Sequence, residues 1–174
     1  MRAREIILSR HRLDRQLTVV TDTIVKNLFE PARATELKQR IAQLRPESER
    51  QWGTMTPAQA LAHCSRAMET AVGDSVPQRM FLGRIFGRFV KRIAIGNDDP
   101  IARNSPTAPN FIVRDHPDFA TERARLNGLV ERFAGGGPTA CTTHPHSFFG
   151  PMKPDEWAVL MYKHIDHHLR QFGA

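Results

Sequence analysis

Two histidines near the C-terminus have the spacing of a metal-binding pair. His164 and His168 lie four residues apart in a segment, 154–172, whose apolar pattern predicts a helix. Side chains four apart on a helix are about 5 to 6 Å apart at Cβ, so both imidazoles can reach one ion. Both histidines belong to a series of residues spaced by four, three, four and four, which places them on the helix side that faces a core. The series is Trp157, Met161, His164, His168 and Phe172.

A third ligand would have to come from another helix, and His63 is the best candidate. It lies beside Ala60 and Ala67, whose small side chains leave room for an ion and its waters. His167 is less suitable, because it is a third of a turn from His168 and nearer the outer face. Three histidines with further positions open to solvent are typical of a catalytic metal site, whereas structural zinc sites usually have four protein ligands.

The same histidines also fit a purely structural interpretation. A histidine on an apolar helix face is commonly a hydrogen-bonded core residue, and the group His164, His167 and His168 could be a solvated helix end. The pair also lacks the glutamate of the zinc-protease motif His-Glu-x-x-His. Spacing alone therefore leaves both interpretations open.

Other side chains are weaker candidates for chemistry. His144 and His146, in the predicted loop 139–151, could act as a general acid or base or contact a substrate, although a polar turn is the favoured interpretation. Cys64 is expected to be a small buried hydrophobe and not a ligand. Asp166 points away from the histidine pair on a helical wheel, so we expect it at the surface or in an interhelical ion pair.

The elements that position these residues are predicted to be helices joined by loops. Helical patterns cover 32–44, a segment from Pro57 to about Val72, 79–95, 118–133 and 154–172, and strand signals are scarce. Thr56 and Gln59 predict a capping box at the start of the second segment, and the glycines 135–137 predict the end of the fourth. We therefore expect an all-α fold, a four-helix bundle with an extra basic amphipathic helix at 79–95.

Length and composition predict one globular domain over residues 26–174. Residues 1–25 lack a continuous amphipathic period, and we interpret them as an N-terminal extension, either a flexible arm or a stretch that is not translated. No apolar run approaches the roughly 20 residues needed to cross a bilayer, and no secretory signal is recognised. With two cysteines only, the expected location is cytoplasmic.

The net charge of +7 is concentrated in two segments. Residues 1–15 carry a sum of +3 and residues 78–95 a sum of +5, which leaves the remainder near neutral. The segment 79–95 is expected to have an apolar side and an opposite basic side, which is common for a bundle helix with a basic outer face. The apolar side consists of Leu82, Ile85, Phe86, Phe89 and Ile93, and the basic side of Arg84, Arg88, Lys91 and Arg92. No aromatic stacking pattern accompanies the charge, so we expect neither nucleic acid nor a membrane as a partner.

Four strings of residues resemble an uncharacterised branch, a domain of unknown function, of the DinB-like (DinB/YfiT-like) superfamily. The resemblance spans about Lys26 to Gly173. It rests on Lys26-Asn27-Leu28-Phe29, Trp52-Gly53-Thr54-Met55-Thr56-Pro57 through His63-Cys64, Pro106-Thr107-Ala108-Pro109-Asn110-Phe111, and Tyr162-Lys163-His164-Ile165-Asp166-His167-His168-Leu169-Arg170-Gln171-Phe172-Gly173.

The resemblance implies a DinB-like four-helix bundle, often dimeric, that holds a divalent metal ion, zinc or nickel, on His63, His164 and His168. Relatives in that superfamily include thiol-dependent transferases and isomerases, so the implied function is a metal-dependent transferase or hydrolase acting on a small molecule. The metal would activate a water or a low-molecular-weight thiol. The alternative is a non-catalytic binding or stress-response bundle that uses the ion for stability. One departure is Lys153, where this branch is expected to have a capping Thr or Ser before the last helix.

Overall fold

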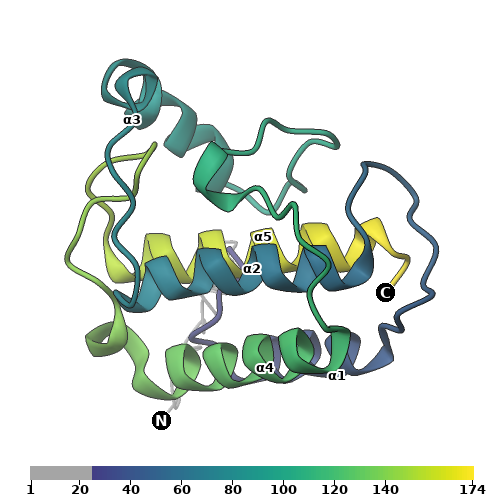
Figure 1. Ribbon diagram of the computed structural model, residues 1–174. Coiled ribbons are helices and arrows are strands. Elements are labelled where there is room, and N and C mark those ends of the chain that lie inside the picture. Colours follow the sequence, from purple (N-terminus) through teal and green to yellow (C-terminus); the bar gives the residue numbers. More distant parts are fainter. Residues whose placement is uncertain (1–24) are drawn as a thin grey trace, which may run out of the picture.

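The computed structural model describes residues 25–174, which form helices and loops (Figure 1). The elements are α1 (Pro31–Gln43), α2 (Pro57–Val72), α3 (Phe81–Ile95), the 3-10 helix η1 (Pro109–Phe111), α4 (Phe119–Gly136), the 3-10 helix η2 (Gly137–Ala140) and α5 (Pro154–Gln171). The described residues form no strand, only an isolated antiparallel bridge between His146 and Gly150. The predicted all-helical class is thus confirmed, whereas the extension predicted over 1–25 lies, but for its last residue, outside the described residues.

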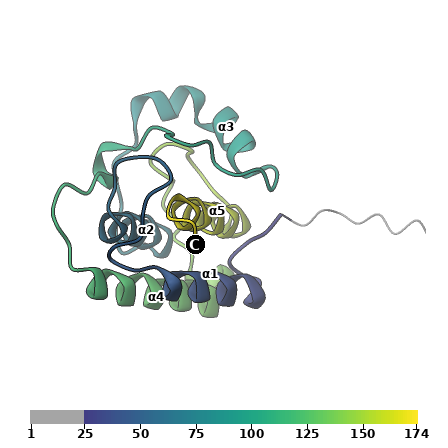
Figure 2. The same ribbon diagram turned by 90° about the vertical axis from the view of Figure 1, so that its right-hand side faces the viewer.

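Four of the helices surround one hydrophobic core. Each of them packs against two neighbours in the cyclic order α1, α4, α2, α5. In Figure 2, α2 and α5 form one layer and α1 and α4 a second layer below it, while α3 lies above the first layer. The largest fully buried side chains come from all four helices and from the segment before α1: Trp157, Phe133, Leu28, Leu37, Ile41, Met68, Leu126 and Ile165.

Local sequence signals account for most of the helix ends. Thr56 Oγ1 accepts a hydrogen bond from the Gln59 amide at 3.2 Å, and Gln59 Oε1 accepts one from the Thr56 amide at 3.0 Å. This is the predicted capping box, and it fixes the start of α2. Helix α4 continues three residues beyond the predicted end, through Gly135 and Gly136, and stops only at Gly137, whose φ of 58° is left-handed.

Helix α5 starts at the predicted residue although Lys153 provides no side-chain cap. Glu156 compensates in part, because its carboxylate accepts a hydrogen bond from the Lys153 amide at 2.8 Å. Pro154 at the first helical position and Asp155 in the first turn also favour a helix start. Farther along, Asp166 pairs with Arg40 of α1 at 2.7 Å, which is the expected interhelical ion pair.

Helix α3 differs from expectation in the face that it turns inward. Gly83 and Gly87 are its only buried residues, and a Cβ on either would overlap the carbonyl oxygen of Phe148. Most of the larger apolar side chains of α3 therefore point outward together with most of its basic ones, so the expected arrangement with only a basic outer face is wrong. No helix within residues 25–174 combines the length and the apolar character needed to cross a membrane.

Replacing Gly83 by Ala tests this close contact. In an unobstructed helix the change would stabilise the protein by about 0.5 to 1 kcal/mol, because Ala loses less backbone entropy on folding. Here the added methyl group collides with the Phe148 carbonyl, so we expect G83A to lower the free energy of unfolding, by about 1 kcal/mol or more, in urea denaturation.

Gly128→Ala in α4 is the matched control, because a Cβ at that position has no neighbour within 4 Å. We expect this variant to be as stable as the wild type or slightly more stable. Equal stabilisation by both substitutions would show that α3 does not lie against Phe148 as described.

Candidate metal centre

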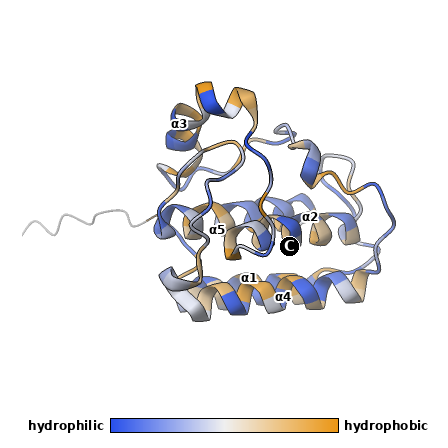
Figure 3. Cartoon of the chain, turned by 60° about the vertical axis from the view of Figure 1, so that its left-hand side comes forward, coloured by the Kyte–Doolittle hydropathy of each residue, from blue (hydrophilic) through white to orange (hydrophobic). Residues whose placement is uncertain are grey.

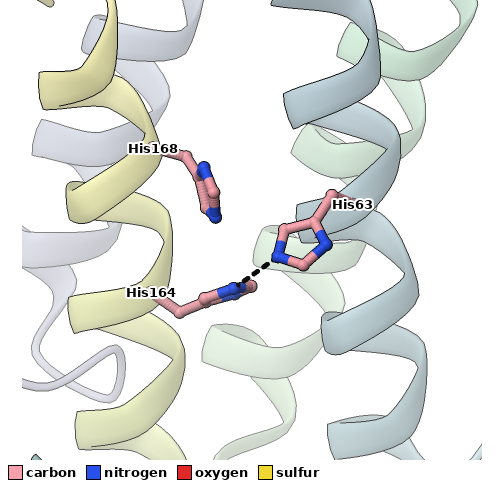
Figure 4. A group of neighbouring side chains, drawn as sticks. All are labelled: His63, His164 and His168. Atoms are coloured by element: carbon pink, nitrogen blue, oxygen red, sulfur yellow. Dashed lines mark hydrogen bonds between the residues drawn. The ribbon is translucent and has the colours of Figure 1, made fainter. Parts of the chain in front are cut away.

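Three histidines from two helices converge in the interior. His63 projects from α2, and His164 and His168 project from α5 toward it (Figure 4). The ring centroids are 4.7 to 5.0 Å apart, and the Nε2 atoms of His63 and His164 are 2.8 Å apart. One ring nitrogen from each residue lies within 4.8 Å of the other two. The structure thus brings together the three histidines singled out in the sequence.

A backbone carbonyl fixes the proton position on His63. Its Nδ1 lies 2.9 Å from the carbonyl oxygen of Phe111 in η1, and because a carbonyl can only accept, Nδ1 carries the proton. The lone pair of the neutral ring is therefore on Nε2, the atom that faces His164. Hydrogen bonding of the remote nitrogen to a carbonyl is the usual way in which a metal-binding histidine is oriented.

A side-chain amide does the same for His168. Gln171 Nε2 donates to the carbonyl of Trp52 at 2.8 Å, which orients its Oε1 toward His168 Nδ1 at 2.9 Å. Nδ1 must then be the donor, and the lone pair of the neutral ring is on Nε2. Gly53 makes this approach possible, because it has a left-handed φ of 75° and any Cβ there would overlap the Gln171 amide.

His164 is the member of the group with the least polar support. Its Nδ1 is buried without a hydrogen-bond partner among the described residues. If no ion were bound, the 2.8 Å contact with His63 would require a proton on His164 Nε2, because His63 offers a lone pair there. A cation between the rings removes this requirement, since all three can then offer lone pairs. Neutral imidazole donors suit borderline divalent ions such as zinc and nickel, so the residues present fit a metal ion.

Burial keeps these imidazoles in the form that binds metals. Desolvation lowers the pKa of His63 and lowers that of His168 to about 3. The pKa of His164 is also held well below its usual value, mainly by burial and then by the neighbouring rings. Neutral rings are the metal-binding form, so at neutral pH little proton competition opposes an ion here.

The histidines lie at one side of a cavity of about 640 Å³. This is the size of many small-molecule sites. Its other walls are mostly apolar and come from α3, from the loop 101–111 and from the loop 146–149: they include Met80, Leu82, Val90, Ala94, Ile101, Pro106, Ala108, Phe111, Phe148 and Phe149. The loop from Pro106 to Phe111 therefore borders the site.

The remaining histidines are placed differently. His167 lines the cavity, but its Nδ1 donates to the Ile101 carbonyl at 3.2 Å and it is not one of the three converging residues. His146 also lines the cavity, whereas His144 is exposed and does not. His146 Nδ1 accepts hydrogen bonds from two backbone amides, so a neutral His146 carries its proton on Nε2.

The cysteine next to His63 belongs to the core. Cys64 is buried among apolar residues, and burial raises the pKa of its thiol. A protonated, buried thiol is neither a metal ligand nor a nucleophile. This agrees with the sequence expectation for Cys64.

Sequence reasoning missed the groups that orient the rings. Gln171 lies three residues after His168 on the same helix, a spacing that could have indicated the contact. The carbonyls of Phe111 and Trp52 could not have been found in this way, because every residue has a carbonyl and only the path of the loops selects these two.

Fold and site together define an all-helical protein with a three-histidine cluster beside a largely apolar cavity. The chain belongs to the family described as protein of unknown function DUF1569, which matches residues 29–174. Searches of curated proteins and of solved structures found no match.

The pKa values of the buried histidines predict a stability that depends on pH. For His146, burial lowers the pKa to about 4 in the folded protein, against about 6.5 in an unfolded chain. The unfolded state therefore binds more protons below pH 6.5, and stability falls as the pH falls toward 4. For protein treated with a chelator, we expect the free energy of unfolding to drop over this range by on the order of 3 kcal/mol from such a group, measured by urea denaturation at each pH.

His146→Gln should make this pH dependence weaker, because it removes one of the titrating groups. His144→Gln is the matched control: it changes an exposed histidine of the same loop and should leave the pH dependence unaltered. A free energy of unfolding that stays constant from pH 6.5 to 4 would contradict the burial of these rings.

Proposed function

We propose that this protein is a divalent-metal-dependent enzyme of the DinB-like superfamily, with zinc or nickel held by His63, His164 and His168. The observation that carries the proposal is the convergence of three imidazoles, one buried and two half-buried, beside a cavity that can hold a small molecule. Three protein ligands leave coordination positions for a water or a substrate, as in catalytic zinc sites.

The arrangement of the helices supports the place in that superfamily. One ligand comes from α2 and a pair four residues apart comes from α5, the last helix, as the sequence resemblance implies. The helices α1, α2, α4 and α5 around one core fit a four-helix bundle of the DinB-like type, with α3 as the extra helix. A cytoplasmic homodimer is part of the same proposal, and size-exclusion chromatography with light scattering tests the dimer.

The proposed reaction is transfer or hydrolysis with an activated water or thiol. A bound ion of this kind lowers the pKa of a coordinated water or thiol, which generates a nucleophile near neutral pH. The apolar walls would bind the organic part of the substrate and keep water away. His146 Nε2–H would serve as a hydrogen-bond donor to a substrate in the cavity, because its Nδ1 is already occupied.

Metal content of the purified protein tests the ligand assignment. We expect about one divalent ion per chain in the wild type and a loss of most of it in H63A, H164A and H168A, measured by elemental analysis. H167A is the matched control, because His167 lies on the same helix and lines the same cavity but does not converge with the other three. Equal metal content in H168A and the wild type would contradict the assignment.

A second measurement separates an enzyme from the non-catalytic alternative. Protein loaded with cobalt should show a new thiolate-to-metal absorption band when 2-mercaptoethanol is added, if a coordination position is open to thiols. A spectrum that responds to neither thiol nor pH would favour a filled coordination sphere and a bundle that uses the ion for stability.

Gln171 offers a test of how the ligands are oriented. Gln171→Leu removes the acceptor for His168 Nδ1, so we expect metal affinity to fall by about 10- to 100-fold in a competition titration with a chelator. Gln171→Glu keeps an acceptor oxygen and should retain more of the affinity. Gln43→Leu, at an exposed glutamine of α1, is the control and should bind the metal like the wild type.

A further inference from the structure

The outward side of α3 exposes more large apolar surface than any other part of residues 25–174. Phe81 and Phe89 retain 74% and 70% of their accessible surface. They belong to a group of exposed apolar side chains on this helix: Phe81, Leu82, Ile85, Phe86, Phe89 and Ile93. Contiguous apolar surface of this kind marks an interaction site in soluble proteins. Figure 3 shows α3 projecting from the rest of the molecule, with hydrophobic and hydrophilic stretches in succession.

The packing of α3 fixes which side faces outward. Gly83 and Gly87 lie against the Phe148 carbonyl, where no side chain fits. On the same helix, Lys91 donates to the Pro151 carbonyl and pairs with Glu156 of α5 at 2.8 Å. Rotating α3 to bury its phenylalanines would break these contacts and would bring large rings onto the carbonyl. The apolar side is therefore held away from the core.

The basic side chains of α3 lie next to the apolar ones. Arg84, Arg88 and Arg92 are exposed, and none of them forms an ion pair within residues 25–174. At 100° per residue, Arg88 and Arg92 lie on either side of Phe81 on the helical wheel, and Arg84 lies next to Arg88. The helix itself contains no acidic residue. We call this combined surface, the six apolar residues and the three arginines, the α3 outer face.

We propose that the α3 outer face docks on an anionic lipid bilayer, with α3 lying in the plane of the interface. A helix of this type places its large apolar side chains among the acyl chains and its arginines at the phosphate level. Charge favours lipid over a second copy of the chain, because two such faces in contact would bring their arginines together. Nucleic acid would satisfy the arginines but leave six large apolar side chains in water.

The orientation of α3 changes which partner the segment 79–95 can bind. The sequence expectation of no membrane partner assumed that the apolar side of the segment 79–95 packs on the core. The structure instead places glycines on the inner side and the large apolar residues on the outer side. The proposal does not depend on the metal centre, since none of the three histidines belongs to the α3 outer face and Leu82 is the one residue of that face that also lines the cavity.

Vesicle co-sedimentation of the full-length chain tests the proposal. With vesicles of phosphatidylcholine and phosphatidylglycerol in a 3:1 ratio, we expect binding at low salt that weakens as salt is added. Vesicles of phosphatidylcholine alone should bind the protein at least about tenfold more weakly. F81S/F89S and R84Q/R88Q should each lose about tenfold or more of the affinity for the anionic vesicles.

R45Q/R50Q is the matched control, because it removes two exposed arginines outside α3 and should change vesicle affinity less than twofold. Circular dichroism should show equal helix content in all variants, since each substitution is at an exposed residue. The proposal is overturned if the wild type does not bind anionic vesicles, or if the control loses as much affinity as R84Q/R88Q. It is also overturned if F81S/F89S converts a dimer to a monomer while neither the wild type nor any variant binds vesicles, because a second copy of the chain then covers the α3 outer face.

Discussion

The site depends on the approach of α2 to α5, which brings three imidazoles together beside a largely apolar cavity. His63 Nε2 and His164 Nε2 are 2.8 Å apart, a distance that two lone pairs cannot hold without a proton or a cation between them. Burial makes protonation of the rings unfavourable. A neutral His164 with its proton on Nε2 satisfies this contact without an ion, whereas a bound cation would let all three neutral rings offer their lone pairs to it. The packing of α2 against α5 therefore sets the chemistry of the site.

Loops supply what the two helices cannot. The carbonyl of Phe111 determines directly which nitrogen of His63 is protonated. The carbonyl of Trp52 does the same for His168 through the side chain of Gln171. The segment that carries Phe111 also lines the cavity. Ligand orientation and cavity shape therefore depend on the same stretch of chain, so a change in the loop 101–111 would alter both.

The sequence predicted the helices and the shared face of His164 and His168 because both follow from the helical period, whereas His63 was selected by its alanine neighbours and by the family resemblance. Residues at steps of three and four must share a face, so the placement of His164 and His168 beside Trp157 and Met161 needed no tertiary information. The inner face of α3 could not be predicted in the same way. Its apolar period is as clear as that of a core helix, and only the contact of two glycines with the Phe148 carbonyl decides which face turns inward. The end of α4 was misplaced for a similar reason, since glycines can continue a helix until a left-handed residue, here Gly137, stops it.

The glycine contact of α3 also bears on how a molecule could reach the histidines. Helix α3 forms part of the cavity wall, yet only Ile95, its last residue, packs against the hydrophobic core. The first turns of α3 rest on the Phe148 backbone through Gly83 and Gly87, outside the set of core side chains. The groups that hold and orient the three imidazoles thus belong to α2, α5 and the loops, while α3 supplies cavity wall without supporting the ligands.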